Sequence, residues 1–216
     1  MIVTNESTQF LDATFENIIL ASHMLKQGKL VAFPTETLYG LGADATNSRS
    51  IIKVFTAKSR PLDKPLIILV KDSSEGARHA EFCDDARQLT KTFWPGPLTL
   101  ILNRHPNCTL PQSLNPYNST ISLRSPGNHV AMRLLNCFSG PITAPSANLS
   151  GHPPPNTAGE VMRTLNNRID GVLDGGKCQG SASSLLDLTS GIPRLIRKGP
   201  ITKSQIEEVI KKAVNE

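Results

Sequence analysis

The chain has 216 residues, of which 38% are hydrophobic and 5% aromatic, and it carries a formal net charge of +5. This length suffices for one domain that buries roughly 70% of its unfolded surface, and no apolar run approaches the ~20 residues of a membrane span. The positive charge favours anionic partners, either nucleotide or nucleic acid.

The N-terminus and the cysteines indicate the cellular setting. Residues 1–10 lack the basic and apolar regions of a secretory signal. The four cysteines are widely spaced and form no Cys-x-x-Cys pair, which argues against a zinc site or a disulfide framework. We therefore predict a cytoplasmic protein without membrane contact.

Two helices are expected in the first 60 residues, after a loose lead-in or edge strand over residues 1–11. The first helix covers residues 14–26, and Gly28 is suited to end it. Asn47 or Ser48 is suited to cap the second helix, which Pro61 must end by residues 59–60. The apolar residues expected on the buried faces are Phe15, Ile18, Ile19 and Leu25 in the first helix, and Ile51, Ile52 and Phe55 in the second.

Between these helices, residues 30–42 predict a buried strand followed by a polar turn. The apolar run 30–33 forms the strand, and Pro34 ends it because proline has no N–H to donate to a ladder. Gly40 and Gly42 allow a tight return or a close backbone approach to a ligand. An α/β sheet presents chemistry in this way at the carboxyl end of a strand.

The rest of the chain continues the alternation of strands and helices. Thr157 with Glu160 and Thr202 with Gln205 have the spacing of capping boxes. The expected strands are 66–70, 98–102, 120–124, 142–144, 171–174, 184–188 and 193–197, and the expected helices are 84–93, 129–138, 157–165 and one after Thr202 with Ile206, Val209, Ile210 and Ala213 on its apolar stripe. This order predicts an α/β fold, with one domain over residues 1–216 (core about 14–214) and a twisted mixed β-sheet flanked by helices.

One glycine-rich segment imitates a phosphate-binding loop. Residues 171–178 nearly spell the P-loop pattern, but Cys178 stands where a hydroxyl residue is needed. The expected strand also lies inside the pattern, and the next segment returns to a strand instead of opening a helix. We interpret this segment as a strand and a turn.

Four polar residues, far apart in the chain, carry a more specific signal. Lys58 and Arg60 end the second helix, and Ser146 and Asn148 follow a short strand. Taken separately, these pairs are ordinary for a basic helix terminus and a turn. Together with Trp94-Pro95-Gly96-Pro97-Leu98-Thr99 and Arg197-Lys198-Gly199-Pro200, they occur in an order that resembles the YrdC family of threonylcarbamoyl-adenylate synthases. The resemblance runs from about Leu30 to the C-terminal helix.

The resemblance implies a fold with an open basic cavity at the strand ends and a nucleotidyltransferase reaction. L-threonine, bicarbonate or CO2, and ATP would give threonylcarbamoyl-AMP and pyrophosphate, with Mg²⁺ bound through the nucleotide phosphates. The product would pass to a tRNA threonylcarbamoyl-transferase complex for modification of adenosine 37, and a weak RNA contact is compatible with this role. Some family members carry a second domain, which we do not expect here.

The resemblance also implies roles for particular residues. Lys58 and Arg60 are the expected catalytic residues, because the reaction needs charge neutralisation and alignment more than a covalent nucleophile. The expected ATP-binding residues are Lys58, Arg60, Thr120, Ser146, Asn148 and Arg197. The expected threonine-binding residues are Thr35, Arg124 and Ser183, and the run 181–184 permits a shift of one serine. Glu36 is expected to be a base, a metal ligand or an ion-paired structural residue.

The chain departs from the family pattern at two positions, and two other functions are compatible with parts of the sequence. Pro154 stands where relatives often have a hydroxyl, and a family histidine near strand 66–70 has no counterpart. A non-catalytic RNA-binding module would also explain the charge, although few aromatic residues are available for base stacking. A sugar-phosphate lyase on a similar fold would need an acidic metal cluster, for which the sequence offers only scattered carboxylates.

Overall fold

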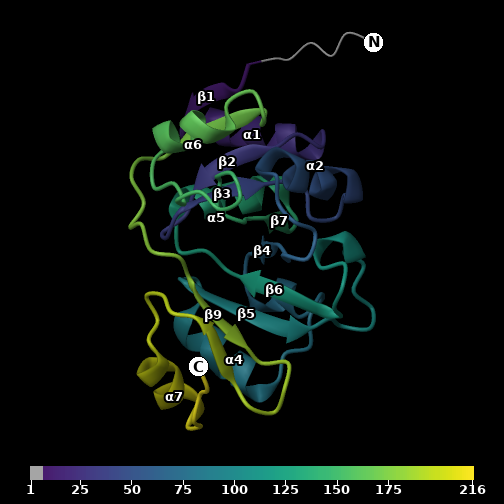
Figure 1. The fold of residues 1–216 in the computed structure, drawn as a ribbon, viewed down its shortest axis with the longest axis vertical. Coiled ribbons are helices and arrows are strands. Elements are labelled where there is room, and N and C mark those ends of the chain that lie inside the picture. The colour runs from purple at the N-terminus through teal and green to yellow at the C-terminus, as the bar shows by residue number, and fades with distance from the viewer. Residues whose placement is uncertain (1–6) are drawn as a thin grey trace.

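The computed structural model describes residues 7–216 and divides the strands between two mixed sheets (Figure 1). The first sheet has the order β1 (Gln9–Asp12), β8 (Gly171–Asp174), β2 (Val31–Pro34) and β3 (Tyr39–Gly42). The second has the order β10 (Arg194–Arg197), β9 (Ser184–Asp187), β5 (Leu98–Asn103), β6 (Thr120–Arg124), β4 (Ile67–Leu69) and β7 (Ile142–Thr143). The α/β class is confirmed, whereas the single sheet expected from the sequence is replaced by two.

Local pairing explains this division. β3 returns antiparallel to β2 instead of crossing over, and β2 pairs parallel with β8 on its other side. The two sheets are joined by isolated bridges from Gly40 to Ser146 and from Asp44 to Ile142, and by the Thr143 hydroxyl of β7, which donates to the Leu41 carbonyl oxygen of β3 at 3.1 Å. The carboxyl end of β2 therefore lies at the junction of the sheets.

Helices cover the outer faces of both sheets. In Figure 1 the first sheet, in the upper half, lies among α1 (Phe15–Lys26), α2 (Ser48–Lys58), α5 (His129–Phe138) and α6 (Ala158–Leu165). The second sheet, in the lower half, packs with α4 (Asp84–Phe93) and α7 (Lys203–Ile210). Two short helical turns complete the fold, α3 (Ser73–Gly76) and the 3-10 helix η1 (Gln112–Leu114). Within residues 7–216, no helix has the length and apolar character needed to span a bilayer.

Helix boundaries follow the capping residues. Asn47 caps α2 through its side-chain oxygen, and Gly28 takes a φ of +74° after α1. The capping box of Thr202 and Gln205 is complete at α7. At α6 the Glu160 carboxylate instead accepts from the N–H of Asn156, so the expected box is only half formed.

The buried helix faces differ from those expected. Phe15, Ile19 and Ile52 are exposed, with Ile52 retaining 55% of its accessible surface. The core-facing stripe of α1 is Ile18, Ala21 and Leu25, because this stripe points toward α5. In α2, Val54 is buried in place of Ile52. Ala213, expected in the last helix, lies beyond the end of α7 and is exposed.

The two glycines that follow the β2 turn allow neighbouring segments to approach closely and do not form the turn. Gly40 and Gly42 both lie within β3. A Cβ at Gly42 would stand 2.8 Å from the Phe33 ring and 2.9 Å from the Val31 carbonyl oxygen, so only glycine fits there. The turn itself is closed by the Thr35 hydroxyl, which donates to the Leu38 carbonyl oxygen at 2.7 Å.

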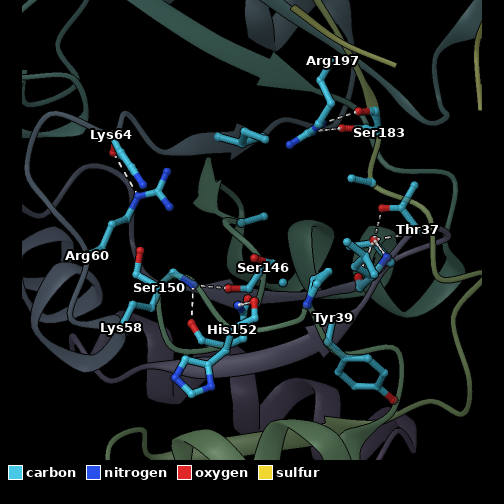
Figure 2. A pocket seen from close by; sticks show the side chains of 18 of the residues that line it. Thr37, Tyr39, Lys58, Arg60, Lys64, Ser146, Ser150, His152, Ser183 and Arg197 are labelled. Carbon is cyan, nitrogen blue, oxygen red and sulfur yellow. Dashed lines mark hydrogen bonds between the residues drawn. The ribbon is translucent and has the colours of Figure 1, made fainter. Parts of the chain in front are cut away.

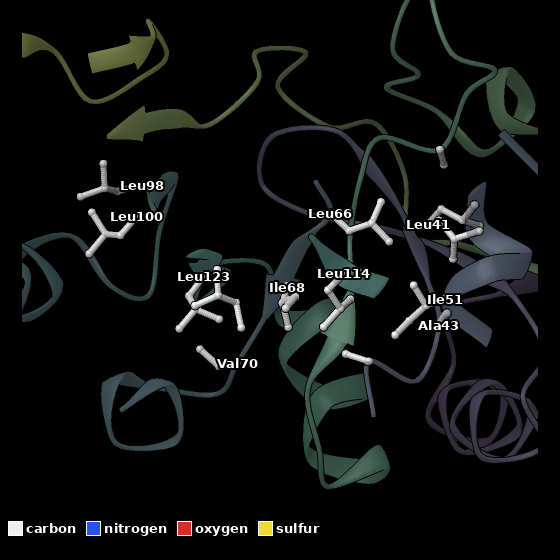
Figure 3. Close-up of a cluster of buried hydrophobic side chains, with 14 of the residues drawn as sticks. Leu41, Ala43, Ile51, Leu66, Ile68, Val70, Leu98, Leu100, Leu114 and Leu123 are labelled. Carbon is white, nitrogen blue, oxygen red and sulfur yellow. The ribbon is translucent and has the colours of Figure 1, made fainter. Parts of the chain in front are cut away.

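The main hydrophobic core continues beneath both sheets and supports the region where they meet (Figure 3). It contains Leu41 from β3, Ile51 from α2, Ile68 from β4 and Leu123 from β6, all fully buried. A second cluster fills the space between α1 and α5. Because the elements that meet at the sheet junction share one closely packed core, the backbone positions of the residues that project from them are fixed.

Candidate functional site

A cavity of about 290 Å³ opens at the junction of the sheets. Its walls come from the β2–β3 hairpin, the end of α2, strands β4, β6 and β10, and the segment after β7 (Figure 2). Five of its lining side chains are cationic: Lys58, Arg60, Lys64, Arg124 and Arg197. The fold thus gathers positive charge from distant parts of the chain into one concave site.

Lys58 is the last residue of α2, and its side chain is almost completely buried, with 1% of the residue exposed. Its Nζ donates to the carbonyl oxygen of Ser146 and, at 2.6 Å, to that of Asn148. Burial, assisted by the positive charge of Arg60, lowers the pKa of Lys58 from 10.5 to about 7. The two carbonyl acceptors oppose this effect because they stabilise the ammonium.

Arg60 shares the cavity with Lys58 because the helix ends between them. Ser59 takes a left-handed conformation with φ +48°, which turns the chain and removes the helical spacing that would separate the two side chains. Arg60 donates from Nε to the Lys64 carbonyl oxygen at 3.0 Å and from Nη2 to the Pro65 carbonyl oxygen at 2.9 Å. Burial lowers its pKa, and the charge of Asp63 acts in the opposite direction.

Ser146 and Asn148 lie opposite these cations, in the segment after β7 that crosses β3. The N–H of Ala147 donates to the Tyr39 carbonyl oxygen at 2.8 Å, which fixes this segment against the hairpin. The Asn148 side chain donates from Nδ2 to the carbonyl oxygens of Leu149 and His152. Its Oδ1 is buried and accepts no hydrogen bond from residues 7–216.

Arg124 ends β6 and is held on three sides. It donates from Nε to the Gly96 carbonyl oxygen at 3.2 Å and from Nη1 to the Thr37 hydroxyl at 3.0 Å. Its Nη2 lies 2.7 Å from Glu36 Oε1, and both side chains are largely buried. Of the roles considered for Glu36, the ion pair is the one that its position supports.

Arg197 and Ser183 form a second polar pair on the wall above. Arg197 donates from Nε to the Ser183 carbonyl oxygen at 3.0 Å and from Nη2 to the Ser183 hydroxyl at 3.1 Å. Burial, with the charge of Arg124, lowers the pKa of Arg197. Ser183 is the serine of the run 181–184 that lines the cavity, whereas the hydroxyl of Ser184 is directed to the Ile201 carbonyl oxygen.

Thr120 and the P-loop-like segment do not line the cavity. Thr120 begins β6 outside the cavity lining, and its hydroxyl accepts from Asn115 Nδ2 at 2.9 Å. The P-loop-like segment is a strand and a turn, as predicted: β8 ends at Asp174, and Lys177 is exposed in the following loop. Thr35, Lys58, Arg60, Arg124, Ser146, Asn148, Ser183 and Arg197 all line the one cavity.

The structure adds lining residues that the sequence did not single out. One of them is Thr37, whose hydroxyl accepts from Arg124; the family motif pointed only to Thr35, two residues earlier. Lys64 belongs to the site because Arg60 binds its backbone, and its only sequence signal is its nearness to the Lys58–Arg60 pair. Tyr39, Ser150, His152 and Pro154 also line the cavity.

The donor set of the described residues does not suit a metal ion held by protein ligands alone. No three His, Cys, Asp or Glu side chains within residues 7–216 come together as a metal-binding group. Glu36, the carboxylate nearest to Arg124, is engaged in its ion pair. A cation in this cavity would therefore need oxygen ligands from a bound molecule.

Comparisons with known proteins agree on one family. The Sua5/YciO/YrdC family model, described as telomere recombination, matches residues 23–199. The threonylcarbamoyl-AMP synthase of Bacillus subtilis is 42% identical over 93% of this chain and 60% of its own length. That of Pyrococcus abyssi is 40% identical over 89% of this chain and 57% of its own length. The chain thus spans somewhat more than half the length of these two relatives.

Solved structures extend the agreement to three dimensions. P. abyssi Sua5 complexed with L-threonine has a TM-score of 0.92 and 37% identity, covering 96% of this chain and 63% of that chain. Escherichia coli YciO has a TM-score of 0.81 with 24% identity, covering 89% of this chain and 96% of that chain, which is a likeness of fold. The motifs, the fold and these relatives together establish that the chain belongs to the Sua5/YciO/YrdC family.

Proposed function

We propose that this protein is an L-threonylcarbamoyladenylate synthase. The observation that carries the proposal is the single cavity in which five cations, several hydroxyls and an amide converge from distant segments. Relatives at 40% and 42% identity are named threonylcarbamoyl-AMP synthase, and a Sua5 structure is described as complexed with L-threonine. Both substrates of such an enzyme carry negative groups that this lining is suited to bind.

On the amino-acid side, Arg124 binds the threonine carboxylate. Its guanidinium is pre-oriented by Gly96, Thr37 and Glu36, so little conformational freedom is lost on binding. Thr35 and Ser183 supply hydroxyls near it. The amine reacts with bicarbonate or CO2 to give a carbamate; with bicarbonate, a C–N bond forms and water leaves.

On the nucleotide side, Lys58, Arg60 and Arg197 neutralise the phosphates of ATP. A carbamate oxygen attacks the α-phosphorus, a new O–P bond forms, and the bond to the departing pyrophosphate breaks. Lys58 and Arg60 lie side by side at the end of α2, so their charges act on the same group as negative charge shifts to the leaving pyrophosphate. Ser146 and Asn148 line the cavity beside them and complete the nucleotide side, where the Ser146 hydroxyl binds the nucleotide.

Magnesium has a limited place in this proposal. Mg²⁺ usually binds through substrate phosphates and keeps several waters, so it would enter with ATP and lower the charge of the phosphate chain. The later stages also belong to the proposal: cytoplasmic synthesis, transfer of the adenylate to a tRNA-modifying complex acting on adenosine 37, and at most a weak contact with RNA.

A pyrophosphate-release assay with each substrate omitted in turn tests the function. Release is expected only when ATP, L-threonine and bicarbonate are all present. Lys58→Ala and Arg60→Ala are each expected to lower turnover by on the order of 10² or more, by analogy with the loss of one electrostatic donor. Release that ignores threonine would rule out the reaction, and RNA binding without any release would favour the RNA-binding alternative.

A further inference from the structure

Tyr39 is a cavity residue whose side chain has no part in the proposed reaction. It begins β3, and Figure 2 shows its ring extending away from the open space between the cations. The residue is fully buried, and its hydroxyl donates to the Gly176 carbonyl oxygen at 2.8 Å and accepts from the Gly175 N–H at 3.3 Å. Burial raises the pKa of Tyr39, so the phenol keeps its proton and remains a donor.

The two glycines that contact this hydroxyl begin the β8–β9 connection, residues 175–183. The connection leads from the first sheet to the second and has no regular secondary structure (Figure 1). Along these residues only Cys178 and Ser183 are buried. Ordering such a segment costs conformational entropy, which its contacts with the rest of the chain must offset.

The β8–β9 connection reaches the amino-acid side of the cavity. The Gly180 N–H donates to the Thr37 carbonyl oxygen at 2.9 Å, and the Thr37 hydroxyl in turn accepts from Arg124. Ser183, which lines the cavity, is the last residue of the connection. The position of two hydroxyl-bearing residues near Arg124 therefore depends on this segment, whereas the cations at the end of α2 are held by other segments.

Cys178 packs between these two hydrogen-bonded points. Its N–H donates to the Asn156 carbonyl oxygen at 2.8 Å, and its side chain belongs to the main core. Burial raises the pKa of its thiol to about 11, although a backbone hydrogen bond from Thr35 acts in the opposite direction, so the thiol stays neutral. The β2–β3 hairpin thus holds the connection by hydrogen bonds at Tyr39 and Thr37, with an uncharged contact between them.

We propose that the Tyr39 hydroxyl is a positioning group for the amino-acid subsite, because it anchors the β8–β9 connection to the β2–β3 hairpin. This role rests on the proposed function for the amino acid, and it requires no contact between Tyr39 and a substrate. Without the hydroxyl, the connection samples conformations that displace Thr37 and Ser183, and L-threonine must restore the ordered conformation when it binds. The loss of threonine affinity is therefore limited by the contribution of the lost hydrogen bond.

Tyr39→Phe removes the hydroxyl and keeps the ring. In calorimetric titrations of the full chain, its affinity for L-threonine should be about 3- to 10-fold lower, which corresponds to the net contribution of one neutral hydrogen bond. Its affinity for ATP should change by less than ~2-fold, because the cations at the end of α2 are held independently. The Tm should fall by only about 2–4 °C, since Gly176 is exposed and its carbonyl oxygen can accept from water.

Hydrogen exchange of the unliganded protein tests the anchor without any substrate. In Tyr39→Phe the amides of residues 175–183 should exchange about 3- to 10-fold faster than in the wild type, and those of α2 should be unchanged. Saturating L-threonine should slow the exchange of residues 175–183. Tyr117→Phe, which removes the same hydroxyl from an exposed side chain outside the cavity, is the matched control and should alter neither exchange nor affinity.

Unchanged exchange of residues 175–183 in Tyr39→Phe would overturn the anchoring role. Equal losses of affinity for L-threonine and ATP would overturn it as well, because a general loss of structure has that result. Wild-type protein that fails to bind L-threonine would remove the proposed function together with the subsite. Wild-type binding of L-threonine with the same affinity in Tyr39→Phe would instead remove only the role of Tyr39.

Discussion

The ammonium of Lys58 lies 2.6 Å from the carbonyl oxygen of Asn148 and so joins two segments that are distant in sequence. The same Nζ donates to the carbonyl oxygen of Ser146, and both carbonyls are turned toward the end of α2. The lysine therefore has two tasks: it holds the segment after β7 in place, and it presents charge to the cavity. Experiments on Lys58 must separate these tasks, since an unpaired buried carbonyl costs about 1–3 kcal/mol.

The pH dependence of ATP binding separates them. The pKa of Lys58 is lowered to about 7, mainly by burial, and bound phosphate favours the ammonium and raises that pKa. ATP binding should therefore take up protons near neutral pH, and affinity should fall as pH rises from 7 to 9. Calorimetry in buffers of different ionisation enthalpy measures the uptake. Lys58→Arg, which stays charged, should lose most of this dependence, and an unchanged pH profile in that variant would contradict the assignment.

The Glu36–Arg124 ion pair predicts a stability change that the substrate reverses in part. Glu36→Gln keeps the shape but leaves the Arg124 charge uncompensated at a largely buried site, which should lower the free energy of unfolding by about 3 kcal/mol. L-threonine, whose carboxylate replaces the missing charge, should raise the Tm of this variant more than that of the wild type. Equal shifts in the two proteins would show that threonine does not approach Arg124.

Arg124→Ala tests the same subsite through affinity. The affinity for L-threonine should fall by about 10-fold or more, the loss expected for a charge-assisted hydrogen bond. The affinity for ATP should change by less than ~3-fold. Separate titrations with threonine and with ATP provide the comparison. A larger effect on the affinity for ATP would show that Arg124 binds the nucleotide and not the amino acid.

Threonine recognition should depend on its hydroxyl as well as its carboxylate. Thr35, Thr37 and Ser183 surround the Arg124 side of the cavity with hydroxyl groups, and a site built to bind a substrate hydroxyl rejects analogues that lack it by orders of magnitude. Turnover of L-2-aminobutyrate should therefore be at least ~100-fold slower in kcat/KM. Comparable turnover of the two amino acids would mean that the hydroxyl is not bound.

The P-loop-like segment should be dispensable for nucleotide binding. Lys177 is exposed in the loop after β8 and does not line the cavity. Lys177→Ala should change ATP affinity by less than ~3-fold, because no helix N-terminus follows to bind phosphate. Loss of ATP binding with an unchanged Tm would show that this loop, and not the cavity, binds the nucleotide.

Elements with strong local signals were predicted well from the sequence. The helix Asp84–Phe93, the strand Thr120–Arg124 and the helix His129–Phe138 have the boundaries that their periodicity indicates. Proline and glycine positions also marked the ends of α1 and α2 correctly. These features depend on neighbouring residues, which a single sequence displays directly.

Features that depend on distant partners were missed. Whether Ile52 or Val54 faces the core depends on what packs against α2, and an apolar side chain is compatible with either position. The division into two sheets depends on the pairing of β2 with β8, which lies far along the chain. In the site, motif order located the signature cations, whereas Lys64 and Thr37 became visible only through their contacts with Arg60 and Arg124.

The most direct test of the proposed reaction is mass-spectrometric detection of its product after incubation with ATP, L-threonine and ¹³C-labelled bicarbonate. We expect threonylcarbamoyl-AMP that carries one ¹³C atom, and we expect this product to be absent when threonine is omitted or when Lys58 and Arg60 are both replaced by alanine. Full product formation by that double variant would show that Lys58 and Arg60 are not the catalytic residues. AMP and pyrophosphate formed without any labelled adenylate would contradict the proposed function itself.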